Sequence, residues 1–283
     1  MNPAGPTDTA LLVARMSNDS GQPLAHLVNY ACHPVSLAWQ NRLISPDYVG
    51  AMREVIESRW DVPVLFLQGA SGDLNPRECY SGDPAVADRN GRQLGLAVAS
   101  VLEGLQPAGM QSVYTGAVIS GANLGTWQHR ALPEERTATR MDLRRSEIEL
   151  PIKPDFPSLE ELRAQRAAAT DRVLQDRIDR RIFLRQALGP GPVDRMGVWL
   201  WRLGDAVLVG IANECYHILQ KQLRVRFPRT PLFISTVTNG GIGYLPPREV
   251  YGQDIYQVNQ TPYAAGCLER TIETLEREIW DML

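Results

Sequence analysis

The first third of the chain alternates between strand-like and helix-like hydrophobic patterns. Residues 11–16 and 25–31 each have the pattern of a strand, and the Ser-Gly-Gln-Pro sequence between them predicts a hairpin turn. Residues 48–59 place apolar side chains three to four positions apart, as an amphipathic helix does, and residues 88–105 repeat that pattern. Residues 62–67 form a short apolar run, which is typical of a strand buried on both faces. This order of elements predicts an α/β layer architecture.

The middle of the chain has a different pattern. Residues 158–188 predict one long helix, entered at Ser158 and Glu161 by a capping box and ended by Gly-Pro-Gly-Pro. Arginines and acidic residues surround a narrow apolar stripe in this stretch. We expect a solvated surface helix laid across the core, and the alternative is an RNA-binding or coiled-coil arm.

The last third predicts a second hairpin followed by further alternation. Residues 197–203 and 206–211 read as strands joined by a two-residue Gly-Asp turn. Residues 213–226 predict a helix, residues 232–237 a strand, and residues 263–283 a terminal amphipathic helix. A Gly-rich loop follows the strand.

Composition supports a single globular unit. The chain has 283 residues, of which 44% are apolar and 22% charged, so a sizeable core is possible and a disordered or collagen-like chain is excluded. We find no repeat or linker, so we treat residues 1–283 as one large domain with a layered β-sheet core flanked by helices, in an αββα-like arrangement. Four cysteines without CxxC spacing are expected to be free thiols.

Charge and hydropathy narrow the possible partners. The formal net charge of −3 argues against a nucleic-acid binder, which usually carries a basic surplus. No apolar run reaches the ~20 residues of a membrane-spanning helix. The first residues show neither the basic nor the apolar region of a signal peptide. Oligomeric state and compartment are not set by these features.

Candidate chemistry lies in loops that follow predicted strands, where α/β proteins usually place their sites. His33 lies in the loop region 29–47, a second polar loop spans 67–77, and Glu214 ends a strand ahead of the loop that carries Tyr244. These three side chains could converge on Zn²⁺, which takes nitrogen and oxygen ligands. The alternatives are that His33 is a hydrogen-bonded structural histidine and that Glu214 begins a helix and stabilises its dipole.

Other catalytic motifs are absent from the sequence. It contains no GxSxG, Walker or HExxH motif, and its Gly-rich loop does not match GxGxxG. Cys32 adjoins His33, but neighbours in a strand point to opposite faces, which argues against a thiol nucleophile paired with that histidine.

Three ordered blocks resemble the neutral/alkaline, non-lysosomal ceramidase family, above all its bacterial members. They are Asn-Tyr-Ala-Cys-His-Pro-Val-Ser-Leu at 29–37, Asn-Arg-Leu-Ile-Ser-Pro-Asp-Tyr-Val-Gly at 41–50, and Phe-Leu-Gln-Gly-Ala-Ser-Gly-Asp-Leu-Asn-Pro-Arg at 66–77. A further block at 244–256 carries three tyrosines at the spacing of that family. The resemblance extends over most of the chain, without an immunoglobulin-like C-terminal domain.

The resemblance implies a zinc-dependent amidase that cleaves the N-acyl bond of ceramide or a similar lipid. By resemblance, His33, Glu214 and Tyr244 match zinc ligands, and Tyr256 matches a tyrosine that faces the substrate amide. Zinc polarises the carbonyl and lowers the pKa of water, and a tyrosine hydroxyl can donate to the developing oxyanion. A secreted or periplasmic location and a peripheral membrane contact are also implied.

Two departures from the family pattern keep a second function open. Asn75 stands where well-studied ceramidases carry a serine that is a proposed nucleophile, although Asn75 can still hydrogen-bond substrate. The family's upstream Thr-His-x-His-Ser-Gly motif, with a further zinc histidine, is missing from this sequence. We therefore expect a ceramidase-like domain that lacks its N-terminal part. The alternative is a catalytically inactive scaffold or a lipid-binding protein on the same fold, and lipid binding would need an exposed apolar patch.

Overall fold

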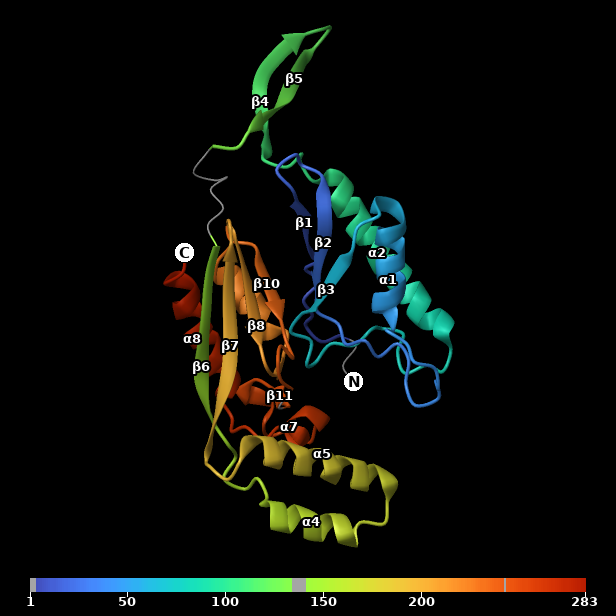
Figure 1. The fold of residues 1–283 in the computed structure, drawn as a ribbon, viewed down its shortest axis with the longest axis vertical. Helices are drawn as coiled ribbons and strands as arrows, with labels where there is room; N and C mark the ends of the chain where they lie inside the picture. Colours follow the sequence, from blue (N-terminus) through green and yellow to red (C-terminus); the bar gives the residue numbers. More distant parts are fainter. Residues whose placement is uncertain (1–3, 134–140, 242) are drawn as a thin grey trace.

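A computed structural model describes residues 4–133, 141–241 and 243–283. The N-terminal half builds a three-stranded sheet in the order β1-β2-β3, with β1–β2 antiparallel and β2–β3 parallel. Two helices cover its outer face, and buried side chains such as Val28, Met52 and Val98 form the core between sheet and helices (Figure 1). These elements are β1 (Leu12–Ser17), β2 (Pro23–Tyr30), α1 (Tyr48–Trp60), β3 (Val64–Gln68) and α2 (Pro84–Gly104).

The C-terminal half builds a second sheet in the order β10-β8-β7-β6, in which β8 and β10 are parallel and the other pairs antiparallel. Its helices α6 and α8 contribute Leu219, Leu223 and Leu275 to the largest buried cluster, which also includes the inward side chains of this sheet. These elements are β6 (Met141–Pro151), β7 (Val193–Leu203), β8 (Ala206–Ile211), α6 (Ile218–Arg226), β10 (Leu232–Ser235) and α8 (Cys267–Trp280).

The two sheets lie between the helices, with α8 on the outer side of one sheet and α1 and α2 on the outer side of the other (Figure 1). The predicted layered α/β fold is therefore confirmed. The side chain of Asn29 joins the sheets: its Nδ2 donates to the carbonyls of Leu67 (2.9 Å) and Ile234 (2.8 Å), and its Oδ1 accepts from the Ile234 amide (3.0 Å). Asn29 is fully buried, so its amide satisfies backbone groups where the sheets meet, beside a backbone bond from the Thr236 amide to the Gln68 carbonyl (2.9 Å).

The prediction of one long helix over 158–188 is wrong. The capping box at its start is present, but the stretch forms two helices, α4 (Leu159–Ala168) and α5 (Arg172–Leu188). Asp171 ends the continuity because its side chain accepts a hydrogen bond from the Leu174 amide and caps α5. An aspartate that caps a helix start competes with continued helix through the same position.

The predicted helix over 213–226 also needs correction, because α6 begins only at Ile218. Glu214 instead lies in a two-residue strand, β9 (Glu214–Cys215), which pairs in parallel with β11 (Tyr244–Leu245). The helix dipole therefore does not explain Glu214. Strands this short leave no hydrophobic period in the sequence. The described part of the chain contains no helix long and apolar enough to cross a bilayer.

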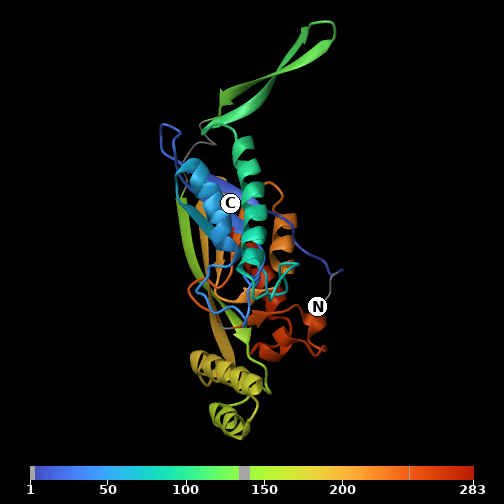
Figure 2. The same ribbon diagram turned by 90° about the vertical axis from the view of Figure 1, so that its right-hand side faces the viewer.

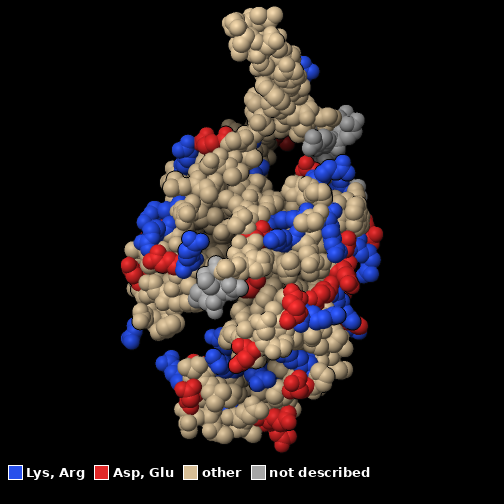
Figure 3. Space-filling model, turned by 180° about the vertical axis from the view of Figure 1, so that it is seen from behind, with Lys and Arg blue, Asp and Glu red and all other residues tan. Residues whose placement is uncertain are grey.

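A two-stranded arm, β4 (Met110–Ile119) with β5 (Asn123–Ala131), projects from the body (Figures 1 and 2). Its surface is almost free of charged side chains, whereas charges of both signs are scattered over the body (Figure 3). Tyr114 and Trp127 stack edge to face across the arm, with ring centroids 5.5 Å apart. At its tip Ile119 is 87% exposed. The arm therefore presents apolar side chains to solvent.

We expect the arm to be dispensable for folding, since β4 and β5 pack on each other rather than on the sheets. The amide of Leu132 donates to the Gly109 carbonyl (2.7 Å), so the base is already closed and a tight turn can replace the arm. Replacing residues 111–130 by Asn-Gly should change the melting temperature by less than about 3 °C in differential scanning calorimetry. A loss of cooperative unfolding would show that the arm is part of the core.

Candidate functional site

The candidate site forms where the strands of both sheets end. His33 follows β2, Leu74 follows β3, Glu214 follows β8, and Tyr244 follows β10. The parallel pairs β2–β3 and β8–β10 each bring their carboxyl ends to one edge, and the two edges meet. The structure thus brings His33, Glu214 and Tyr244 together, although more than 200 positions separate His33 from Tyr244 in the sequence.

His33 is held from both ring nitrogens. Nδ1 lies 3.2 Å from the Leu74 carbonyl, and Nε2 lies 3.0 Å from Glu214 Oε2. Since a carbonyl only accepts, Nδ1 carries a hydrogen, and a second proton is shared between Nε2 and the carboxylate. Burial lowers the pKa of His33, but the hydrogen bond and the negative charge of Glu214 outweigh burial and leave that pKa raised.

The His33–Glu214 ion pair therefore stabilises the metal-free protein in a limited pH range. Because the folded-state pKa of His33 is raised above 6.5, its contribution to the free energy of unfolding is complete below pH 6.5. That contribution is lost as pH rises through the folded-state pKa. Both side chains are partly exposed, so solvent screens the interaction.

Tyr244 lies directly opposite Glu214 in the β9–β11 pair. Burial, together with the negative charge of that carboxylate, raises the Tyr244 pKa well above its usual range, so the phenol stays protonated. The rings of His33 and Tyr244 have centroids 6.4 Å apart, so the imidazole, the carboxylate and the phenol form one cluster.

Tyr256 begins helix α7 (Tyr256–Gln260), and its ring lies edge to face with Tyr244 at 5.9 Å. Its phenol oxygen accepts a hydrogen bond from Arg180 Nη1 at 2.8 Å. Arg180 belongs to α5, the region that the sequence suggested was only a solvated surface. A polar cavity of about 230 Å³ adjoins Tyr256 and is also lined by Arg177, Asp254, Asn259 and Gln260.

Asn75 lies at the margin of the site rather than against the proposed zinc ligands. It is exposed, and its Nδ2 donates to the Tyr80 phenol at 2.8 Å. The pKa of Tyr80 is raised by burial first and, to a smaller extent, by Cys79 and Tyr256. The Tyr80 ring stacks on Trp39, with ring centroids 6.5 Å apart. Sequence reasoning did not identify Tyr80 or Arg180.

The loop with His33 is fixed by the Ser-Pro-Asp-Tyr block that follows it. Asp47 accepts hydrogen bonds from the amides of Leu37 (2.9 Å) and Tyr48 (2.7 Å), which ties the loop to the start of α1. The Tyr48 phenol donates to the Cys32 carbonyl at 2.6 Å, immediately before His33. These side chains therefore position His33 without facing Glu214.

A second set of contacts fixes the loop after β3 to the segment with Glu214. The Gly72 amide donates to the Cys215 carbonyl at 2.8 Å. Asp73 accepts from the backbone amide of His217 (2.9 Å) and lies 2.6 Å from its Nδ1. This loop also presents the Leu74 carbonyl to His33, so its position sets the orientation of the histidine ring.

The donor set fits a zinc ion. Zinc takes nitrogen and oxygen donors, which are supplied here by His33 Nε2, a Glu214 oxygen and the Tyr244 phenol. The Leu74 carbonyl accepts from the other ring nitrogen of His33, a contact that orients the histidine in many zinc sites. Among the described residues no three or more His, Cys, Asp and Glu side chains gather as a metal cluster. The candidate site has two of those residue types, and its third donor is a tyrosine.

The fold is similar to that of neutral ceramidase. It matches the neutral ceramidase of Pseudomonas aeruginosa with a TM-score of 0.60 and 17% identity, over 94% of this chain and 45% of that chain. It also matches a ceramidase complexed with C2, with a TM-score of 0.63 and 14% identity, over 97% and 48% of the two chains. The chain spans about half the length of these structures. No family model matches the sequence, and a search of curated proteins gives no match. The predicted resemblance is confirmed as a likeness of fold.

We expect Gly72→Ala to disturb the site. A Cβ at residue 72 would lie 2.9 Å from the Glu214 carbonyl oxygen, so the loop after β3 must move away from β9. Chemical denaturation should show a loss of about 1–3 kcal/mol in the free energy of unfolding. Gly104→Ala is the matched control, because a Cβ there meets nothing within 4 Å. Equal stability of the two variants would contradict the tight approach.

Proposed function

We propose that this protein is a zinc-dependent amidohydrolase that cleaves the N-acyl amide bond of ceramide or a related lipid amide. The observation that carries the proposal is the approach of His33 Nε2 to Glu214 Oε2 at 3.0 Å, with Tyr244 directly opposite Glu214 in the β9–β11 pair. The likeness of fold to neutral ceramidase supports the choice of reaction and substrate. His33, Glu214 and Tyr244 would hold the zinc ion.

The remaining residues bind and orient the substrate. A zinc ion at this site would supply a Lewis acid for the amide carbonyl and make water more acidic. The Tyr256 oxygen accepts from Arg180, so its own hydrogen is free to be donated to the oxygen of the substrate amide. Asn75 can hydrogen-bond the substrate through its amide, but an amide nitrogen is not an acyl acceptor. Water is therefore the acyl acceptor, and the products are a fatty acid and an amine.

Metal analysis tests the ligands. The chain purified with zinc should retain about one zinc ion, and His33→Ala should remove it, because two oxygen donors alone bind weakly. His129→Ala is the matched control, since His129 lies exposed on β5 of the arm. Mass spectrometry of the dialysed protein gives the stoichiometry. Full zinc retention by the His33 variant would refute the ligand set, and release of fatty acid from N-acyl-sphingosine by the zinc-loaded wild type tests the reaction.

Arg180→Ala tests the role of Tyr256. Without the guanidinium the phenol turns freely, so kcat should fall about tenfold while the zinc content stays the same. Arg163→Ala, an exposed position on α4, should leave kcat unchanged. Tyr256→Phe should lower kcat at least as much as Arg180→Ala does. The double variant should lower kcat no further than Tyr256→Phe alone. Additive losses would mean that Arg180 acts elsewhere.

The second candidate function, a catalytically inactive scaffold or a lipid-binding protein, is supported by two observations. Asn75 replaces a serine and is exposed, and the arm presents apolar side chains to solvent. A zinc-loaded chain that sediments with ceramide-containing vesicles and releases no fatty acid would favour this function. Activity on another amide or ester would support a hydrolase whose substrate is not ceramide.

A further inference from the structure

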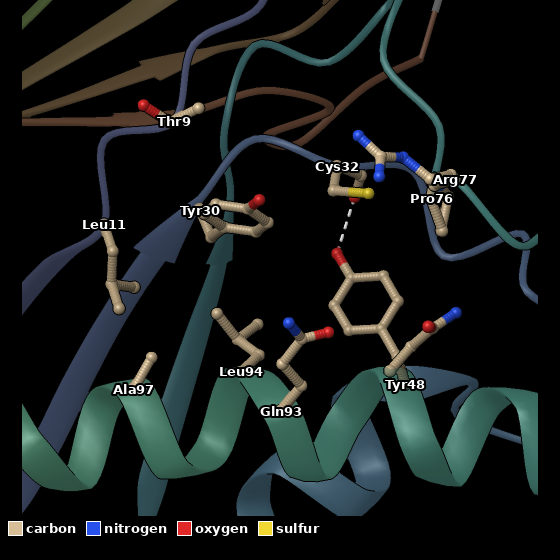
Figure 4. Close-up of a pocket in the computed structure, with 11 residues that line it drawn as sticks. Thr9, Leu11, Tyr30, Cys32, Tyr48, Pro76, Arg77, Gln93, Leu94 and Ala97 are labelled. Carbon is tan, nitrogen blue, oxygen red and sulfur yellow. Dashed lines mark hydrogen bonds between the residues drawn. The ribbon is translucent and has the colours of Figure 1, made fainter. Parts of the chain in front are cut away.

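A separate pocket of about 360 Å³ lies between the N-terminal segment, the end of β2, α2 and the loop after β3 (Figure 4). It lies behind the loops of the candidate site, because Cys32 precedes His33 and Pro76 follows Asn75. Its size is at the lower end for pockets that bind small organic molecules. The pocket is lined by Thr9, Leu11, Tyr30, Cys32, Tyr48, Pro76, Arg77, Asn90, Gln93, Leu94 and Ala97.

The lining is apolar at one end and cationic at the other. Figure 4 shows Leu11 and Ala97 at the end opposite to Arg77, with Leu94 between them. Among the described residues, the Arg77 guanidinium and the Gln93 amide have no hydrogen-bond or ion-pair partner. Apolar walls with a single free cation select a ligand that has a hydrocarbon part and an anionic end.

No carboxylate balances Arg77 within the pocket. None of the described lining residues is Asp or Glu. Three acidic residues adjoin lining residues in the sequence, and each has other partners: Asp8 pairs with Arg224 at 2.7 Å, Glu78 pairs with Arg89, and Asp47 accepts hydrogen bonds from the amides of Leu37 and Tyr48. The charge of Arg77 is therefore available to a ligand.

The Tyr30 phenol, which also lines the pocket, stays neutral. Burial, with smaller effects from Cys32 and Asp8, raises the pKa of Tyr30, so its phenol remains a hydrogen-bond donor. It adds no negative charge that would repel an anion.

We propose that this pocket binds an amphiphilic carboxylate, with the carboxylate on Arg77 and the aliphatic chain along Leu11, Leu94 and Ala97. Two parallel N–H donors of a guanidinium match the two oxygens of a carboxylate, which an alcohol or an ammonium head does not offer. The proposal goes beyond the proposed function and does not rest on it, since it requires neither zinc nor hydrolysis.

Isothermal titration calorimetry with decanoate, below its micelle concentration and with a metal chelator present, tests the proposal. Decanol and decyltrimethylammonium are the neutral and cationic probes. Decanoate should bind at least about tenfold more tightly than either, and Arg77→Gln should remove that preference. Arg92→Gln is the matched control, because Arg92 is an exposed arginine of α2 outside the lining.

A second pair of variants tests the apolar end. Ala97→Glu places a carboxylate in the pocket and should weaken decanoate binding at least about tenfold, whereas Leu96→Glu lies on the same helix outside the lining and should not. Equal binding of decanol and decanoate, or undiminished binding by Arg77→Gln, would overturn the proposal. His33→Ala separates the two sites: loss of decanoate binding in that variant would place the ligand at the candidate metal site and also overturn the proposal.

Discussion

The buried amide of Asn29 is a central contact between the two sheets, which the bond from the Thr236 amide to the Gln68 carbonyl also joins. It satisfies the amide and carbonyl of Ile234 on β10 and the carbonyl of Leu67 on β3. Removing it would leave several buried backbone groups without partners, at about 1–3 kcal/mol each. His33 follows β2 a few residues after Asn29, and the segment with Tyr244 follows β10. The junction between the sheets therefore sets the distance between the two parts of the candidate site.

From that junction the site is assembled mainly through backbone groups. Gly72 allows the loop after β3 to approach β9, and the Asp73–His217 pair holds it there. The Leu74 carbonyl then fixes the ring of His33, while the parallel β9–β11 pair fixes Tyr244 against Glu214. The rigid scaffold therefore orients a small donor set before any ligand binds, which is the condition for a metal site of defined geometry.

The sequence predicts the repetitive parts of this fold and the candidate donors, but not how they are arranged. Periodicity placed the first hairpin, α1, α2 and the β7–β8 hairpin, because each buries one face over many residues. Periodicity failed before Asp171, where the side chain of that residue caps a new helix instead of letting one helix continue. It also failed at β9 and β11, which are too short to show a period. Arg180 was missed because an arginine among many on a charged helix gives no signal of its long-range partner Tyr256. His33, Glu214 and Tyr244 were proposed from their places at predicted strand ends and from a resemblance, and only the structure shows that they lie together.

Cys32 and His33 show how one loop serves two environments. The imidazole of His33 faces Glu214, whereas the thiol of Cys32 lines the pocket behind the loop. Burial raises the pKa of this thiol to about 12, so it is protonated at neutral pH. The carboxylate and phenols on the His33 side favour a cation, and the unpaired Arg77 on the Cys32 side favours an anion. The same loop therefore places one side chain in the candidate metal site and the neighbouring side chain in the pocket, because consecutive residues of an extended segment point to opposite sides.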